Sequence, residues 1–350
     1  MTRTEATLGP RPDQVRRLLV IRRRGLGDAL VSLPAVAALA DLYPRAEVDL
    51  LIDRPFAPLL TDLSGRARVL EWPPRAGGLW TLLRTPRYDL VADLLSTPRT
   101  AFWTALSGAR WRLGYDLAGR RWAYNLRVPR NRDQERELHQ YAGEGFLDLV
   151  RILGAAPPPW SPAAPAPALA LGTGYTAWRD ARPAAAGPEV ALLLSAGWPA
   201  KAWPPARAAE FAAAARRDGA RVTLVPGPGD AELAAALTAL DPQVALAPPT
   251  DLRELADLLG RADVAVTTDG GGRHVAAAVG TPTVTLYGPT DPRGWNREHP
   301  LHVAVRTGVD CSPCDLRKCP VPGHPCLDQL AGARVWAATR DLLNTRGARP

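Results

Sequence analysis

The 350 residues of the chain exceed what one hydrophobic core usually holds, so two domains of about 150 to 180 residues each are expected. Hydrophobic residues make up 46% of the sequence and charged residues 22%, which excludes disorder over most of its length. The formal net charge of +8 favours anionic partners: nucleic acid, phosphorylated glycans or an anionic membrane surface. Because the arginines are dispersed and no run of only Lys and Arg carries interleaved aromatic residues, a nucleic-acid partner is not expected.

The sequence also bears on the location of the protein. No apolar stretch approaches the ~20 residues needed to cross a bilayer. The first 17 residues are polar and lack the hydrophobic stretch of a signal peptide. We therefore expect a cytoplasmic protein, which either stays in solution or docks peripherally on the inner face of the cell membrane.

The N-terminal half alternates short apolar runs with helical periodicity. A buried strand is expected at residues 18–21, a helix at 28–42 and a second strand at 48–52. Because the connection between these strands is too long for a hairpin, they should form a parallel pair with a crossover helix. Further strands are expected at 68–70 and 88–92, and a closing helix at 136–153.

The C-terminal half repeats this pattern after a stretch rich in proline and alanine at residues 155–188, which indicates a linker. Strands are expected at 190–194, 222–225, 264–267 and 283–287. One helix should begin near Pro205 and end before Gly219, and another should follow the N-cap Asp251. The expected divisions are an N-terminal acceptor-side domain at 1–160, the linker and the start of the second domain at 161–188, a donor domain at 189–330 and a C-terminal helix at 331–350. For that last helix, packing back on the N-terminal domain is left open.

Two successive units of this kind predict an α/β protein with two Rossmann-like domains whose parallel sheets face a central cleft. In such sheets ligands bind where strands end and helices begin. The first such loop, residues 22–28, carries Gly25 and Gly27, which let the backbone approach a ligand. Asp28 is either a general base or only the cap of its helix. The loop lacks the third glycine of a dinucleotide fingerprint, which argues against a nicotinamide-dependent oxidoreductase.

Two loops of the second half carry further candidates. Residues 269–274 (DGGGRH) place three glycines at a helix start, where backbone N–H groups suit a diphosphate, and Arg273 and His274 add side-chain donors. The alternative is a flexible turn between strand and helix. Lys201 follows the first strand of this half and is either a group that neutralises a leaving phosphate or a solvated surface charge.

All four cysteines lie within 16 residues, which is not how a secreted disulfide framework is spread along a chain. A structural zinc site with His324 as a further ligand, reduced structural cysteines and a local disulfide are the alternatives. A catalytic metal is not expected. The four residues are Cys311, Cys314, Cys319 and Cys326.

Four of these segments together resemble glycosyltransferase family 9, the ADP-heptose:lipopolysaccharide heptosyltransferase family. The resemblance runs from about residue 18 to residue 330 in the order and spacing of the family. It rests on GLGDAL at 25–30, WPAKAWP at 198–204, DGGGRH at 269–274 with AAAVGTP at 276–282 and YGPTDP at 287–292, and CSPC at 311–314.

The resemblance implies a GT-B fold and an inverting, metal-independent transfer that requires no cofactor. The donor is ADP-heptose by family default, and the acceptor is the hydroxyl of an anionic glycan or a glycolipid of the cell surface. Asp28 matches the proposed catalytic base, and Arg24, Gly25 and Gly27 form its acceptor-side loop. The implied donor-binding residues are Lys201, Asp230, Asp269, Gly270, Gly271, Arg273 and His274.

Two positions depart from the family pattern. Gly270 stands where Ser or Thr usually follows the motif aspartate, and Gly197 stands where a hydroxyl residue is common four positions before the lysine. Each hydroxyl would face the donor phosphates, and loss of such a hydrogen bond costs about 1.5 to 3 kcal/mol unless backbone N–H groups or Arg273 replace it. The alternative function is therefore a non-catalytic paralogue that binds a nucleotide sugar on the same scaffold.

Overall fold

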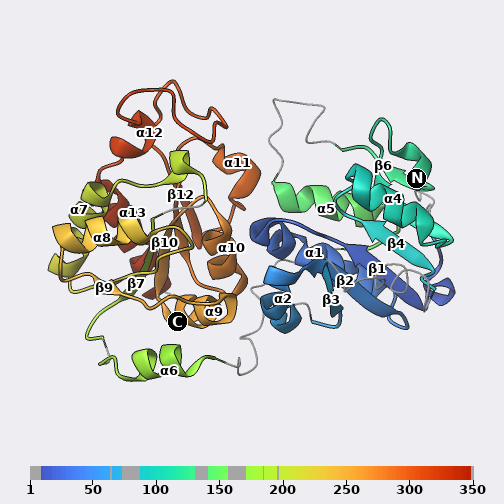
Figure 1. Cartoon of the computed structure of the whole chain (residues 1–350), viewed down its shortest axis with the longest axis horizontal. Helices are drawn as coiled ribbons and strands as arrows, with labels where there is room; N and C mark the ends of the chain where they lie inside the picture. Colours follow the sequence, from blue (N-terminus) through green and yellow to red (C-terminus); the bar gives the residue numbers. More distant parts are fainter. Residues whose placement is uncertain are drawn as a thin grey trace. The chain divides into compact units, whose positions relative to one another are not determined.

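The computed structural model describes residues 9–63, 65–72, 87–130, 141–156, 171–183, 185–194 and 197–347. The chain divides into two compact units, Met1–Ser161 and Pro162–Pro350. Each unit contains a six-stranded sheet in which neighbouring strands run parallel, with helices beside it (Figure 1). The prediction of an α/β protein with two parallel, Rossmann-like sheets is confirmed.

The sheet of the N-terminal unit has the strand order β3-β2-β1-β4-β5-β6. Short apolar runs form its central strands because both faces of a parallel sheet are covered, and four of the five β1 side chains are buried. The strands are β1 (Arg17–Ile21), β2 (Glu47–Asp53), β3 (Arg68–Trp72), β4 (Leu90–Asp93), β5 (Trp111–Tyr115) and β6 (Leu126–Val128). The helices are η1 (Pro12–Gln14), α1 (Leu26–Leu42), η2 (Arg54–Phe56), α2 (Ala57–Leu63), α4 (Pro98–Leu106), η3 (Arg121–Ala123) and α5 (Ala142–Arg151).

The sheet of the C-terminal unit has the strand order β12-β11-β10-β7-β8-β9. The strands are β7 (Glu189–Leu193), β8 (Arg221–Leu224), β9 (Ala245–Leu246), β10 (Val264–Thr268), β11 (Thr283–Leu286) and β12 (His302–Val305). The helices are α6 (Thr173–Asp180), η5 (Pro199–Lys201), α7 (Pro205–Arg217), α8 (Ala231–Leu240), α9 (Leu252–Arg261), α10 (Gly271–Ala278), α11 (Pro292–Trp295), α12 (Pro325–Asp328) and α13 (Gly332–Gly347). Asp251 caps α9 as predicted, accepting from the backbone nitrogens of Arg253 and Glu254.

Three expected segments differ in detail. The closing helix of the first half is α5, and residues 136–140 of that prediction lie outside the described residues. The linker prolines at 157–167 also lie outside them, whereas α6 forms within the stretch expected to be linker. No helix in the described part of the chain combines the length and apolarity that crossing a membrane requires.

The C-terminal helix α13 packs on α7 of its own unit, whereas the sequence leaves open a return to the N-terminal domain. Gly332 permits this packing, because an added Cβ would collide with the Phe211 backbone nitrogen. The rings of Phe211 and Trp336 then meet edge to face with centroids 5.9 Å apart. Val335, Trp336 and Leu342 of α13 are thus buried in the C-terminal core.

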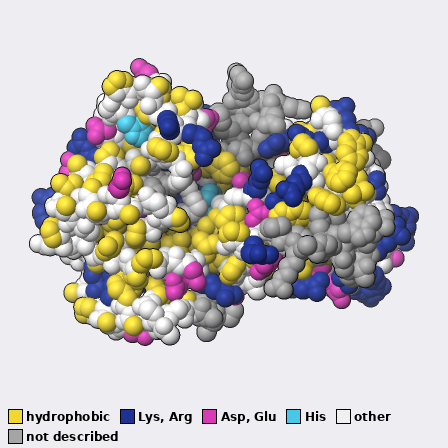
Figure 2. Space-filling view, viewed as in Figure 1, with side chains coloured by type: hydrophobic (Ala, Val, Ile, Leu, Met, Phe, Trp, Pro, Cys, Tyr) yellow, Lys and Arg dark blue, Asp and Glu magenta, His cyan; other side chains and the backbone are white. Residues whose placement is uncertain are grey.

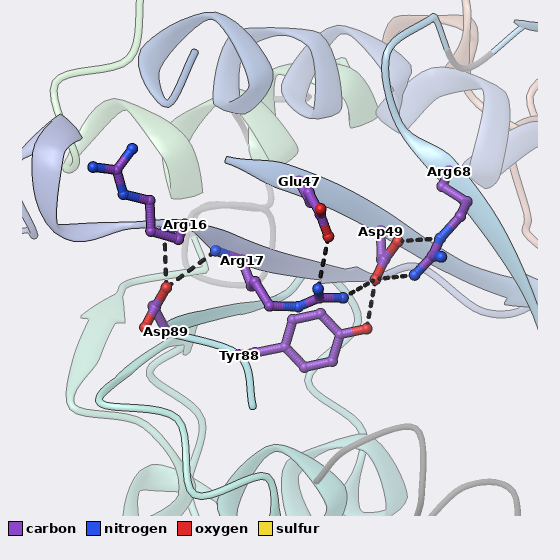
Figure 3. A network of polar contacts seen from close by, with 7 residues as sticks. All are labelled: Arg16, Arg17, Glu47, Asp49, Arg68, Tyr88 and Asp89. Carbon is purple, nitrogen blue, oxygen red and sulfur yellow. Dashed lines mark hydrogen bonds and ion pairs between the residues drawn. The ribbon is translucent and has the colours of Figure 1, made fainter. Parts of the chain in front are cut away.

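A buried carboxylate connects the strands of the N-terminal unit, as Figure 3 shows. Asp49 on β2 is 1% exposed and accepts from Arg68 Nε at 2.8 Å and Nη2 at 3.0 Å. It also accepts from the hydroxyl of Tyr88 at 2.7 Å, and Arg17 Nη2 lies 3.9 Å away. Burial, and then the hydrogen bond to Asp49, raises the pKa of Tyr88, so this hydroxyl remains a donor. Asp49 therefore links β1, β2, β3 and the segment before β4.

We predict that Asp49→Ala lowers the free energy of unfolding by about 3 kcal/mol, because the buried hydroxyl of Tyr88 and the guanidinium group of Arg68 lose their acceptor and Arg17 loses an ion-pair partner. The matched control is Glu71→Gln, which breaks an exposed ion pair with Arg54 (3.1 Å) and should change it by about 0.5 kcal/mol or less. Urea unfolding followed by circular dichroism measures both. Equal effects of the two substitutions would contradict the structural role of Asp49.

Candidate active site

The glycine-rich turn follows β10 at the carboxyl edge of the C-terminal sheet. β10 ends at Thr268, and α10 begins at Gly271 with Gly270 as its cap residue. A Cβ at Gly272 would lie 2.4 Å from Cδ2 of Leu193 on β7, so the glycine lets α10 pack against the sheet without a shift of this leucine side chain. The first backbone N–H groups of α10 therefore lie close to the strand ends, where they suit an anion.

Asp269 joins this turn to two other loops of the same unit. Its Oδ2 accepts hydrogen bonds from Lys201 Nζ and Thr290 Oγ1, each at 2.7 Å, and its main-chain oxygen accepts from Nζ at 3.0 Å. The ion pair is largely buried, since 12% of the Lys201 side chain and 5% of the Asp269 side chain are exposed. The structure thus brings two predicted donor-binding residues together. Sequence reasoning missed Thr290 as a site residue, although its motif was the signal that pointed to this loop.

The loop after β7 places Lys201 at this edge. Trp203 is fully buried and its Nε1 donates to the Leu330 main-chain oxygen at 3.1 Å, which anchors the end of the loop. Lys201 Nζ lies 4.5 Å from the centroid of the Trp198 ring. Gly197 has φ +73°, a conformation in which a serine or threonine would be strained. The departure from the family pattern at this position therefore matches its backbone.

Arg273 and His274 form a buried pair on α10. Arg273 Nη1 lies 3.1 Å from His274 Nδ1, and its Nε and Nη2 donate to Asn296 Oδ1 at 3.3 and 2.8 Å. Because a guanidinium group only donates, Nδ1 must accept, and the proton of the neutral ring lies on Nε2. Burial, followed by the charges of Arg273 and Lys201, holds the pKa of His274 well below its ordinary 6.5. His274 is therefore a neutral donor through Nε2.

The charge of Arg273 has no carboxylate partner among the residues that the structure describes, and 1% of the residue is exposed. A buried cation without a counter-ion is unfavourable, so an anion bound near it is stabilised. The guanidinium group is turned towards Asn296 and His274. Its contribution to a ligand at the glycine turn is thus chiefly its positive charge and the orientation of His274.

Asp230 lies after β8, which is adjacent to β7, and so at the same carboxyl edge. Its Oδ2 accepts from the backbone nitrogen of Gly227 at 2.8 Å, and 7% of the residue is exposed. This hydrogen bond closes the turn before α8. The role of Asp230 towards the nucleoside stays a prediction.

In the N-terminal unit, Gly25 rather than Asp28 is the cap residue of α1. Asp28 lies in the first helical turn, with a third of its side chain exposed, and its Oδ2 is 2.9 Å from Arg22 Nη2. Arg22 is itself buried, with its guanidinium carbon 5.2 Å from the centroid of the Phe146 ring on α5. The side chain of Asp28 is therefore held by a fixed cation and still reaches solvent.

The backbone of the acceptor-side loop favours glycine at one position in particular. Gly25 has φ +74°, and a Cβ there would lie 2.8 Å from Asp28 Oδ2. Arg24 also has a positive φ, +64°, and Gly27 lies within the first turn of α1. This loop belongs to the N-terminal unit, whereas Lys201 and the glycine turn belong to the C-terminal unit.

The four cysteines lie in and beside the segment between β12 and α12. Cys311 and Cys314 are exposed, Cys319 is half-buried and Cys326 is buried, and none of them is in a disulfide. Burial raises the pKa of Cys326 to about 11, so its thiol stays protonated. Among the described residues no three His, Cys, Asp or Glu side chains are grouped so that they could hold a metal ion. The structural zinc site remains a prediction for metal analysis of protein purified without chelator.

Comparison with known proteins identifies the family of the chain. The sequence model of glycosyltransferase family 9 (heptosyltransferase) matches residues 77–324. The chain belongs to this family. It is 28% identical over 318 residues to lipopolysaccharide heptosyltransferase 1 of Pseudomonas aeruginosa, and the aligned region covers 87% of each protein. It is 27% identical over 296 residues to lipopolysaccharide heptosyltransferase 3 of Escherichia coli, covering 77% of this chain and 82% of that one.

Solved structures show the same fold. The ADP-heptose lipopolysaccharide heptosyltransferase II of E. coli matches with a TM-score of 0.73 at 23% identity, over 95% of this chain and all of that one. The E. coli heptosyltransferase WaaC with ADP-2-deoxy-2-fluoro heptose matches with a TM-score of 0.67 at 23% identity, over 93% and 99% of the two chains. The predicted GT-B fold is confirmed, and the family makes the chain a glycosyltransferase.

A histidine near this site predicts a pH dependence of stability. Burial lowers the pKa of His302 from 6.5 to about 3, and its Nδ1 lies 3.0 Å from Thr283 Oγ1. Between about pH 6.5 and pH 3, His302 binds a proton in the unfolded chain but not in the folded chain. The free energy of unfolding therefore has its full value above pH 6.5 and decreases as the pH falls from about 6.5 to about 3.

We expect His302→Asn to remove a slope of about 1.4 kcal/mol per pH unit from the free energy of unfolding in this range. Urea unfolding of the wild type and the variant at several pH values measures the difference. Parallel pH profiles of the two proteins would show that His302 titrates alike in the folded and unfolded chains.

Proposed function

We propose that the chain is an inverting, metal-independent heptosyltransferase that moves heptose from ADP-heptose to a hydroxyl of an anionic glycan or lipid-linked acceptor. The two relatives named above are lipopolysaccharide heptosyltransferases, and one solved structure of similar fold holds ADP-2-deoxy-2-fluoro heptose. The observation that carries the proposal is the buried Lys201–Asp269–Thr290 contact beside the glycine turn. It fixes a cation beside a helix N-terminus, as binding of a diphosphate requires.

The donor diphosphate would contact three groups of the C-terminal unit. Lys201 supplies a charge, the first N–H groups of α10 supply hydrogen bonds, and Nε2–H of His274 supplies a neutral donor. The hydroxyl that Gly270 lacks is replaced by these backbone donors. When the bond to the sugar breaks, negative charge develops on the departing ADP, and preorganised donors of this kind stabilise it. The positive charges of Lys201 and Arg273 would perform the neutralisation that a metal ion performs in other transferases.

Asp28 would act as the general base. In a single displacement the acceptor oxygen attacks the anomeric carbon, its proton passes to a carboxylate oxygen of Asp28, and the bond to ADP breaks on the opposite face of the sugar. Arg22 holds Oδ2 of Asp28 at 2.9 Å, which leaves Oδ1 for the acceptor hydroxyl. Arg24, Gly25 and Gly27 would shape the acceptor-side loop.

The second candidate function is a non-catalytic paralogue that binds a nucleotide sugar, which the glycine residues at positions 197 and 270 favour. Assays of donor hydrolysis and of transfer to several acceptors separate the two functions. Binding of the donor without either reaction would support the paralogue. For the enzyme we propose a cytoplasmic location and, where the acceptor is lipid-linked, peripheral contact with the inner membrane face; no nucleic-acid partner is proposed.

We predict that Asp28→Asn lowers kcat by about 100-fold or more, because general-base catalysis contributes that much, while donor affinity stays nearly unchanged. The asparagine keeps the size of the side chain and an oxygen for Arg22. Steady-state kinetics and calorimetric titration of ADP give the two quantities. A kcat of the variant equal to that of the wild type would show that Asp28 is not the general base.

We also predict that ADP raises the melting temperature more than UDP or GDP at equal concentration. A ligand at 100 times its dissociation constant adds about 2.7 kcal/mol to the stability of the folded state. A thermal shift series with the three diphosphates and with adenosine measures the preference. A larger shift with UDP or GDP would contradict ADP as the nucleotide of the donor but not the proposed transfer of a sugar.

A further inference from the structure

Residues 97–130 hold most of the net charge of the chain. This segment of 34 residues contains seven arginines and one acidic residue, Asp116, which gives a formal charge of +6 out of +8 for the whole protein. It comprises α4, β5, η3 and β6 of the N-terminal unit. The charge that looks dispersed along the sequence is therefore concentrated in one part of the fold.

Three arginines of this segment lack an acidic partner in the described part of the chain. Asp116 pairs with Arg121 at 2.6 Å. Arg99, Arg110 and Arg127 are exposed and form no ion pair with any residue that the structure describes. Such arginines are available to an anionic partner.

Two large aromatic side chains are exposed among these arginines. Phe102 on α4 is 47% exposed and Trp122 on η3 is 60% exposed. The two elements pack on one another through a small core of Ala101, Ala123 and Tyr124, so both aromatic side chains belong to one region of the surface. Figure 2 shows hydrophobic side chains gathered over α4 with Lys and Arg side chains beside them.

Hydrogen bonds hold the region in shape, of which that of Tyr124 is buried and that of Asn125 is exposed. The hydroxyl of Tyr124 donates to Asp93 Oδ2 at 2.7 Å, and Asn125 Nδ2 donates to the Arg110 main-chain oxygen at 2.7 Å. Arg112 Nε donates to the Ala123 main-chain oxygen at 2.8 Å. Trp122 Nε1 donates to the Gly119 main-chain oxygen at 3.0 Å, and the Phe102 ring meets the Trp103 ring edge to face with centroids 5.3 Å apart. These contacts fix the two rings but leave 47% of Phe102 and 60% of Trp122 exposed, which is typical of an interaction site.

We propose that α4 and η3 form a membrane-docking surface, in which Phe102 and Trp122 enter the interface of an anionic phospholipid bilayer and the surrounding arginines bind its headgroups. An indole ring prefers the boundary between headgroups and acyl chains, and arginines near an anionic leaflet add electrostatic attraction. Headgroup phosphates supply counter-ions to the arginines, and the boundary below them accepts the two aromatic rings, so one bilayer surface suits both features. The inference does not depend on the donor or on the transfer reaction.

The test is sedimentation of the full chain with vesicles of phosphatidylcholine alone or mixed with phosphatidylglycerol, both free of any glycolipid. The wild type should bind the anionic vesicles, bind the neutral ones at least about tenfold more weakly, and release in high salt. Phe102→Ser/Trp122→Ser should weaken binding to the anionic vesicles about tenfold or more. Arg127→Gln should weaken it about fivefold.

The matched control is Leu240→Ser/Leu246→Ser in the C-terminal unit, where the two leucines are 57% and 47% exposed. It should bind vesicles like the wild type. The proposal is overturned if the wild type does not bind anionic vesicles, or if both double variants lose binding equally. It is also overturned if the wild type is a dimer that only Phe102→Ser/Trp122→Ser dissociates, because the surface would then join two copies of the chain.

Discussion

The carboxylate of Asp269 is the contact on which the donor side of the molecule depends. It lies just after β10 and binds a lysine that follows β7 and a threonine that follows β11. Neighbouring parallel strands bring these three loops to one edge, but only a shared buried acceptor fixes the position of the Lys201 ammonium group. An exposed lysine would populate many rotamers, and ordering it against a phosphate would cost side-chain entropy and so weaken binding.

A second layer of contacts supports this arrangement. The guanidinium group of Arg273 sets the tautomer of His274, and Asn296 holds the guanidinium group. Both sets of contacts leave positive charge and N–H donors near the start of α10. A site of this kind binds a diphosphate better than a neutral sugar, which fits the proposed departure of ADP.

Much of this architecture could be predicted from the sequence. Short apolar runs with helices between them indicate parallel sheets, and glycines with a lysine and a histidine after strands indicate where ligands bind. The contact between Thr290 and Asp269 could not be predicted, because it depends on which loop of a sheet edge reaches another. The pairing of Arg22 with Asp28 and the burial of Arg273 depend on side-chain direction, which periodicity does not reveal. The packing of α13 on α7 depends on the close approach of the two helices at Gly332. From the sequence, Gly332 indicates only the start of a helix.

The most direct measurement is calorimetric titration of ADP and of adenosine into the wild type and into Lys201→Met/Asp269→Asn. Both residues are replaced because a lone Asp269 would leave a buried charge without a partner. If the pair serves the diphosphate, the affinity for ADP falls by roughly 10- to 100-fold while that for adenosine is unchanged. An unchanged affinity for ADP, or an equal loss for both ligands, would contradict the account.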